Sequence, residues 1–143
     1  MDAQRDAAGE EVDEFLKDAS IQGVKHAEPL TNQEVSILLD RYRHSNQQST
    51  PGFCPPPMVT KTQAYLDQVA GAVGKNAEAA QAIRDRLVEH GIEGVEMALL
   101  ANLMPETAEE AYAMVPSLKR KEGLSQPELQ ELLEQLHSFR QFH

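Results

Sequence analysis

The stretch Ala98-Leu-Leu-Ala-Asn-Leu-Met-Pro-Glu-Thr-Ala-Glu-Glu-Ala-Tyr-Ala-Met-Val-Pro-Ser-Leu118 predicts two helices joined by one sharp break. Pro105 ends the first helix, because proline lacks a backbone N–H and disfavours helix at the residue before it. Thr107 starts the second helix and, with Glu110 three residues later, predicts a capping box. Pro116 ends this helix.

Helical spacing of apolar residues continues from residue 58 to residue 143, with no useful strand alternation. We expect five helices here. Gly74 and Gly91 are each predicted to end a helix, and Asn76 is predicted to cap the N-terminus of one. Ser125 is predicted to form a capping box with Glu128. The buried face of the first of these helices is predicted to contain Val59, Thr62, Leu66, Val69 and Val73. The sequence therefore predicts an all-α fold with a five-helix C-terminal domain.

One further helix precedes this domain. Thr31 and Glu34 predict its capping box, and a single apolar stripe follows at the i, i+3, i+4, i+7 spacing. The stripe consists of Val35, Leu38, Leu39 and Tyr42. Residues 46–57 are polar and then proline-rich, which predicts a linker that separates this helix from the domain.

The stripe of the separate helix needs an apolar surface to cover it, since a helix of about thirteen residues is marginal alone in water. That surface is either the chain's own domain or a partner protein. We favour a partner, because an extended segment at residues 18–30 has the same need through Ile21 and Val24.

The formal net charge of −10 argues against nucleic-acid binding by this chain alone, because phosphate binding draws on clustered Lys and Arg. Residues 1–18 contain seven acidic side chains and two basic ones, so we expect an acidic disordered tail over residues 1–17. The sequence has no long apolar run and no signal-like N-terminus, which predicts a soluble intracellular protein without a membrane contact.

No constellation of residues predicts catalysis, a metal site or a cofactor. The five histidines lack the spacing of metal ligands. Cys54 is predicted to be an exposed thiol in the proline-rich linker. The glutamates that follow Pro105 belong to a helix N-terminus, where negative charge is stabilised. The basic run at 119–121 belongs to a predicted solvated, flexible turn at 119–123 and could touch RNA only lightly. We therefore expect a protein that is not an enzyme and has no small-molecule substrate.

Several motifs resemble those of the fourth-subunit family of eukaryotic RNA polymerase II, stalk subunits related to the archaeal polymerase F subunit. The most specific is Leu-Ala-Asn-Leu-Met-Pro-Glu-Thr-Ala-Glu-Glu-Ala at 100–111, followed by Val-Pro-Ser-Leu at 115–118. Supporting matches are Asp-Ala-Ser at 18–20, Glu-Val-Ser-Ile-Leu-Leu at 34–39, Glu-Leu-Gln-Glu-Leu-Leu at 128–133 and Phe-Arg-Gln-Phe at 139–142.

The resemblance implies a C-terminal domain like the helicase-and-RNase-D C-terminal (HRDC) domain and an N-terminal part that docks on the seventh polymerase subunit. The heterodimer would form the stalk of the nuclear polymerase, position the clamp and support initiation. RNA contact would occur mainly through the partner. Mapped onto this sequence, the expected docking residues are Ile21, Val24, Val35, Leu38, Leu39, Tyr42, Leu99, Leu103, Met104 and Pro105.

Three alternatives stay open at this point. The chain could be the equivalent stalk subunit of RNA polymerase III or of another polymerase. It could also be a stand-alone helical module that binds nucleic acid, or a helical adaptor unrelated to transcription. The acidic tail and the Val-Pro-Ser-Leu element favour polymerase II.

Binding of the isolated chain to single-stranded RNA separates the stalk subunit from the nucleic-acid module. We expect no salt-sensitive binding at micromolar concentration, because the chain is acidic. Fluorescence anisotropy with labelled RNA over a salt series measures this. Micromolar affinity that weakens steeply with salt would support the nucleic-acid module instead.

Overall fold

The computed structural model describes residues 28–69 and 76–142, and all regular secondary structure in this part of the chain is helical. It contains six α-helices, one 3₁₀-helix and no strand, which confirms the predicted all-α class. The elements are α2 (Asn32–Ser49), α3 (Pro57–Val69), α4 (Ala77–Glu89), α5 (Gly94–Leu103), α6 (Ala108–Met114), η1 (Pro116–Arg120) and α7 (Gln126–Phe142). The predicted acidic tail, most of the predicted extended segment, Val73 and Gly74 lie outside the described residues.

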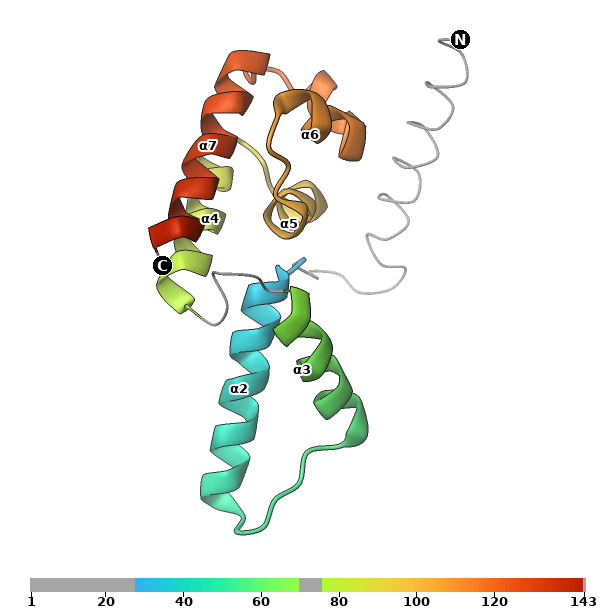
Figure 1. Cartoon of the computed structure of the whole chain (residues 1–143), viewed down its shortest axis with the longest axis vertical. Helices are drawn as coiled ribbons and strands as arrows, with labels where there is room; N and C mark the ends of the chain where they lie inside the picture. The colour runs from blue at the N-terminus through green and yellow to red at the C-terminus, as the bar shows by residue number, and fades with distance from the viewer. Residues whose placement is uncertain (1–27, 70–75, 143) are drawn as a thin grey trace.

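Helices α4 to α7 form a C-terminal body around one apolar core (Figure 1). The buried members of this core all lie between residues 79 and 136. The predicted inward faces of α4 and α7 are confirmed, because Ala80, Ile83, Leu87, Leu129, Leu132, Leu133 and Leu136 are buried. Phe139 packs against the core from its edge. Helical periodicity alone was enough to predict these faces, since each of the two helices covers a single core.

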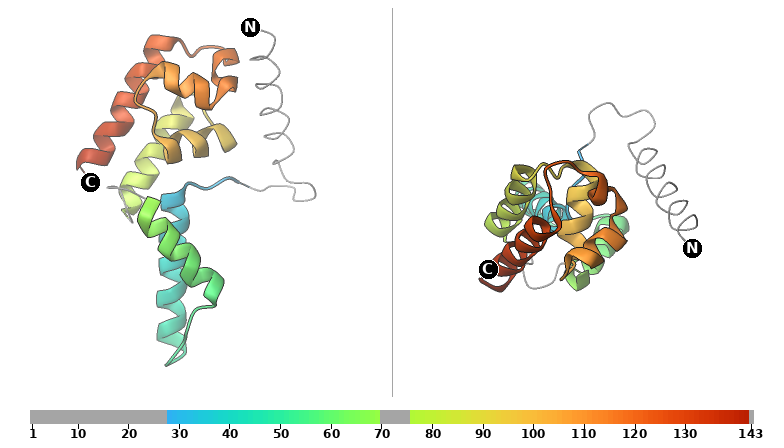
Figure 2. Two further views of the ribbon diagram at one scale, coloured as in Figure 1. Left: turned by 45° about the vertical axis from the view of Figure 1, so that its right-hand side comes forward. Right: turned by 90° about the horizontal axis from the view of Figure 1, so that it is seen from above.

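Helices α2 and α3 lie side by side as a hairpin that projects away from the body (Figures 1 and 2). Helix α2 also contacts α4, so the expectation of a separate helix is wrong. Helix α3 was expected to belong with the later helices, yet among the described elements its main neighbour is α2. Helix α3 buries little apolar surface within the chain: Leu66 is its one buried apolar residue, beside Gln63.

Two predicted capping boxes are confirmed with both of their hydrogen bonds. At the start of α2, Glu34 N–H donates to Thr31 Oγ1 at 3.2 Å, and Thr31 N–H donates to Glu34 Oε1 at 2.9 Å. At the start of α7, Glu128 N–H donates to Ser125 Oγ at 3.4 Å, and Ser125 N–H donates to Glu128 Oε2 at 2.8 Å. The backbone hydrogen bond from Ser125, followed by that of its hydroxyl, lowers the pKa of the Glu128 carboxyl.

The break between α5 and α6 takes a sharper form than the sequence predicts. Met104 ends α5 in a left-handed conformation with φ of 46°, directly before Pro105. Thr107 Oγ1 accepts from Glu110 N–H at 3.2 Å, as expected for a cap. The Glu110 carboxylate, however, accepts from Glu106 N–H at 3.1 Å, so the predicted box forms in only one of its halves.

Two side chains of α7 hold this break in place. His137 Nε2 lies 3.2 Å from the carbonyl oxygen of Pro105, and it must be the donor because a carbonyl only accepts. Gln130 Oε1 accepts from the N–H of Ala108 at 2.9 Å, and Gln130 Nε2 donates to the carbonyl of Glu106 at 3.2 Å. The turn is therefore anchored to a helix that lies far from it in the sequence.

Two predicted element boundaries are wrong. Helix α2 continues to Ser49, although residue 46 was expected to begin a linker. The side chains of Asn46 and Ser49 each donate to a carbonyl four residues earlier in the helix, so these polar residues bond locally without ending the helix. The basic turn at 119–123 is also partly helical, because η1 extends through Arg120.

We expect Gln130→Met to lower the free energy of unfolding by about 1–2 kcal/mol, because it leaves the nearly fully buried N–H of Ala108 without an acceptor. Urea denaturation monitored by circular dichroism measures the change. Gln48→Met, at an exposed position of α2, is the control and should stay within about 0.5 kcal/mol of wild type. Equal stability of the two variants would contradict the anchoring role of Gln130.

Candidate partner-docking site

The predicted docking residues of α2 divide into two kinds. Leu38 and Tyr42 are 48% and 40% exposed, whereas Val35 and Leu39 are half-buried. Tyr42 also has an edge-to-face contact with Phe53, with ring centroids 6.0 Å apart. The remaining N-terminal candidates, Ile21 and Val24, lie outside the described residues. Leu38 is thus the most accessible of the described candidates on this helix.

The predicted docking residues around the break are mostly packed within the chain itself. Leu99 and Met104 lie partly buried against the core of the body, and Pro105 is buried. Leu103 differs, because half of its side chain is exposed. A docking role for the other three stays a prediction, since each already contributes to packing of the chain.

The inner side of the hairpin is polar. Ser36 and Gln63 are buried between α2 and α3, and Gln63 Nε2 donates to Ser36 Oγ at 3.2 Å. The same Nε2 lies 3.2 Å from Asp67 Oδ1. Since polar residues fill this seam, the large apolar residues Leu38 and Tyr42 of α2 remain on its outside.

Helix α3 adds exposed apolar residues that the sequence did not single out for docking. Met58 is 79% exposed and Tyr65 is 57% exposed. Val69 was predicted to face inward, and this is wrong, because it is 41% exposed. The spacing of Met58, Tyr65 and Val69 was a usable signal, since residues seven and four apart share a helix face.

Arg84 of α4 holds the beginning of α2 against the body. Its Nε and Nη2 donate to the two carboxylate oxygens of Glu34 at 2.8 and 2.7 Å. Nη1 donates to Glu28 Oε1 at 2.8 Å, and Nη2 also donates to the carbonyl of Pro29 at 3.1 Å. The side chains of Arg84 and Glu34 are only 13% and 18% exposed. The pair is therefore well shielded from water.

These contacts shift the pKa of both partners. Burial by itself would raise the pKa of the Glu34 carboxyl, but the hydrogen bonds from Arg84 and Thr31 outweigh it and lower the pKa below its ordinary value. The hydrogen bond to Glu34 raises the pKa of Arg84 in return. The sequence alone does not predict this ion pair, because fifty residues separate its members and the capping box already accounts for Glu34.

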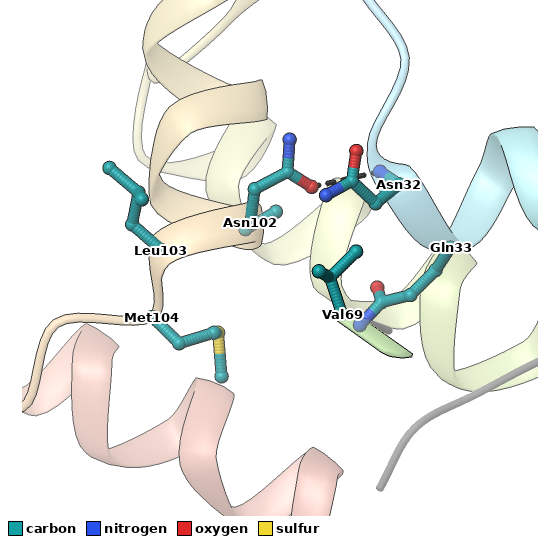
Figure 3. A pocket seen from close by; sticks show the side chains of 7 residues that line it. Asn32, Gln33, Val69, Asn102, Leu103 and Met104 are labelled. Carbon is teal, nitrogen blue, oxygen red and sulfur yellow. Dashed lines mark hydrogen bonds between the residues drawn. The ribbon is translucent and has the colours of Figure 1, made fainter. Parts of the chain in front are cut away.

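The beginning of α2 also meets the end of α5. The backbone N–H of Asn32 donates to Asn102 Oδ1 at 2.8 Å. A pocket of about 230 Å³ lies at this junction, and Figure 3 shows side chains of α2, α3 and α5 around it. Of the predicted docking residues, Leu103 and Met104 line the pocket. Asn32, Gln33 and Asn102 also line it and were not predicted from the sequence.

Several polar side chains elsewhere in the described residues have structural partners. His90 Nδ1 lies 2.9 Å from the carbonyl of Arg86. Lys121 donates to the carbonyl of Gly91 at 2.9 Å and pairs with Glu96 at 3.3 Å. Within residues 28–69 and 76–142, no group of three or more His, Cys, Asp or Glu side chains is placed to hold a metal ion. Cys54 is exposed, as predicted.

The basic run at 119–121 is engaged in contacts within the chain. Lys119 Nζ lies 5.8 Å from the ring centroid of Tyr112, a cation–π geometry, and Lys121 joins η1 to α5 through Glu96. These contacts use the run to fix η1 on the body. None of the helices in the described part of the chain is long and apolar enough to cross a membrane.

Comparison with known proteins gives matches over most of the chain. The sequence profile of the family described as RNA polymerase Rpb4 matches residues 29–140. The chain is 37% identical over 111 residues to DNA-directed RNA polymerase II subunit 4 of Arabidopsis thaliana, which covers 76% of this chain and 72% of that protein. It is 30% identical over 135 residues to DNA-directed RNA polymerase II subunit rpb4 of Dictyostelium discoideum, covering 84% of each. The subunit rpb4 of Schizosaccharomyces pombe is 33% identical over 114 residues, 79% of this chain and 81% of that protein.

We expect Arg84→Met to lower the free energy of unfolding by about 2 kcal/mol at neutral pH, because it removes charge-assisted hydrogen bonds from a shielded pair. The pKa of Glu34 is lowered by folding, so this contribution is fully present above the unfolded pKa of about 4.3 and is lost as the pH falls through the folded pKa. Urea denaturation at neutral pH and down to about pH 3 should show the gap between wild type and variant narrowing.

Arg41→Met is the matched control, because Arg41 lies exposed on α2. Its stability should stay within about 0.5 kcal/mol of wild type at every pH. A gap between Arg84→Met and wild type that does not change with pH would show that the Glu34 carboxylate is not the partner that matters.

Proposed function

Because the chain belongs to the RNA polymerase Rpb4 family, we propose that it is a non-catalytic subunit of nuclear DNA-directed RNA polymerase II that forms the stalk heterodimer with the seventh subunit. The observation that carries this proposal is the family match over residues 29–140, which includes both the hairpin and most of the body. The names of the three relatives favour polymerase II over polymerase III.

Exposed apolar side chains supply the surface for the heterodimer. Leu38 and Tyr42 on α2 and Leu103 at the end of α5 are each at least 40% exposed. Burial of such side chains on a partner is favourable, since each fully buried large apolar side chain contributes about 1.5–3 kcal/mol. The hairpin exposes Leu38 and Tyr42 without losing its own helical structure, because polar residues fill the seam between α2 and α3.

The charge of the chain supports a scaffolding role. A net charge of −10 repels nucleic acid, and the basic run at 119–121 is occupied within the chain through Lys119 and Lys121. Nascent RNA would therefore be contacted by the seventh subunit. In this proposal the heterodimer positions the clamp and supports initiation, while α3 and the body of α4 to α7 would make up the HRDC-like domain that the family resemblance implies.

We expect Leu38→Asp and Leu103→Asp to weaken the heterodimer by at least about tenfold, because each would bury a charge against apolar surface. Isothermal titration of the purified chain with the seventh subunit of the same species measures the affinity. Gln48→Asp, exposed on the same helix, is the control and should bind like wild type. Thermal unfolding of each isolated variant shows whether it folds.

The two parts of the proposal fail in different ways. Unchanged affinity of Leu38→Asp would remove α2 from the interface. If the wild-type chain formed no complex with the seventh subunit, the stalk assignment itself would be wrong. Recovery of the largest polymerase III subunits with the tagged chain, in place of those of polymerase II, would favour the polymerase III alternative.

A further inference from the structure

The pocket at the junction of α2, α3 and α5 is lined by a buried residue whose hydrogen-bond acceptor has no donor. Gln33 is 7% exposed and lines the pocket, and among the described residues its Oε1 finds no hydrogen-bond partner. A buried acceptor without a donor is destabilising, so a folded chain rarely retains one without a reason. The neighbouring Asn102 Oδ1 is already occupied, because it accepts from the N–H of Asn32.

The walls of the pocket restrict the chemistry of what fits there. No charged side chain is among its lining residues, which are Asn32, Gln33, Val69, Ala101, Asn102, Leu103 and Met104. A cation or an anion would therefore lose its hydration without meeting an opposite charge. Two apolar lining residues, Leu103 and Val69, are 50% and 41% exposed and offer apolar contact. Because polar and apolar residues both line the pocket, the fitting group is neutral and combines an apolar part with at least one hydrogen-bond donor.

The size of the pocket indicates a single side chain as the occupant. Its volume of about 230 Å³ falls below the range of about 300–1,000 Å³ that is typical of small-molecule sites. Tryptophan and tyrosine combine a large apolar ring with one N–H or O–H donor, and both are enriched at protein interfaces. These two residues match the walls and the unpaired acceptor together.

We propose that the pocket receives a tryptophan or tyrosine side chain of the seventh subunit, whose ring N–H or phenol O–H donates to Gln33 Oε1. This inference rests on the proposed function and deepens it, because it assigns Gln33 a role in partner recognition. The Arg84 contacts with Glu34 and Pro29 fix the adjoining residues, so the acceptor is already in position before the partner binds.

Gln33→Met tests the proposal through two readouts that move in opposite directions. The variant keeps the length of the side chain and removes the acceptor. Binding to the purified seventh subunit should weaken about tenfold, since the partner's donor is left buried and unpaired. The melting temperature of the isolated variant should stay the same or rise, because an unsatisfied acceptor has been removed. Gln47→Met, exposed on the same helix, is the control and should change neither.

The possible outcomes are distinct. Affinity within about twofold of wild type would overturn the proposal. A loss of affinity together with a lower melting temperature would also overturn it, because Gln33 would then act in folding. If the wild-type chain does not bind the seventh subunit at all, the proposed function fails as well, whereas a complex that is insensitive to Gln33→Met contradicts only the pocket.

A photo-crosslinking residue in place of Leu103, followed by mass spectrometry of the complex, identifies the occupant. The chain contains no tryptophan, so any crosslinked peptide with tryptophan comes from the partner. We expect a seventh-subunit peptide that contains tryptophan or tyrosine. A crosslinked peptide with neither residue would overturn the assignment of the occupant.

Discussion

The guanidinium of Arg84, on α4, determines how the N-terminal end of the hairpin is positioned against the body. Its four hydrogen bonds reach both carboxylate oxygens of Glu34 in the first turn of α2 and, just before this helix, Glu28 and the carbonyl of Pro29. A planar fork of fixed donors constrains orientation as well as distance, which a lysine at this position would not do. The pocket beside Gln33 and the outward face of α2 both depend on this placement.

The hairpin owes its exposed apolar surface to its polar seam. Ser36 and Gln63 fill the space between α2 and α3, and a single large apolar residue, Leu66, is buried on α3. An apolar seam would have used Leu38 and Tyr42 for the fold of the chain itself. Such a division suits a subunit of a large assembly, because its apolar surface is covered when the assembly forms.

The break between α5 and α6 illustrates how local and distant contacts combine. Thr107 caps α6 by a bond within three residues, and the φ of Met104 ends α5. The direction of the chain between them depends on His137 and Gln130 of α7, which bond to the turn from across the body. The motif that resembles the polymerase subunits is therefore also a structural corner of the fold.

The sequence by itself determined the helical class, the capping boxes of Thr31 and Ser125, and the buried faces of α4 and α7. Each of these depends on residues no more than a few helical turns apart, so the local sequence is enough to predict their hydrogen bonds and spacing. Only the tertiary structure decided that α3 lies on α2, that Val69 faces outward and that Arg84 holds Glu34. These contacts join distant residues, and they depend on which helices can bury enough surface together, a property of the whole packed chain that no local pattern contains.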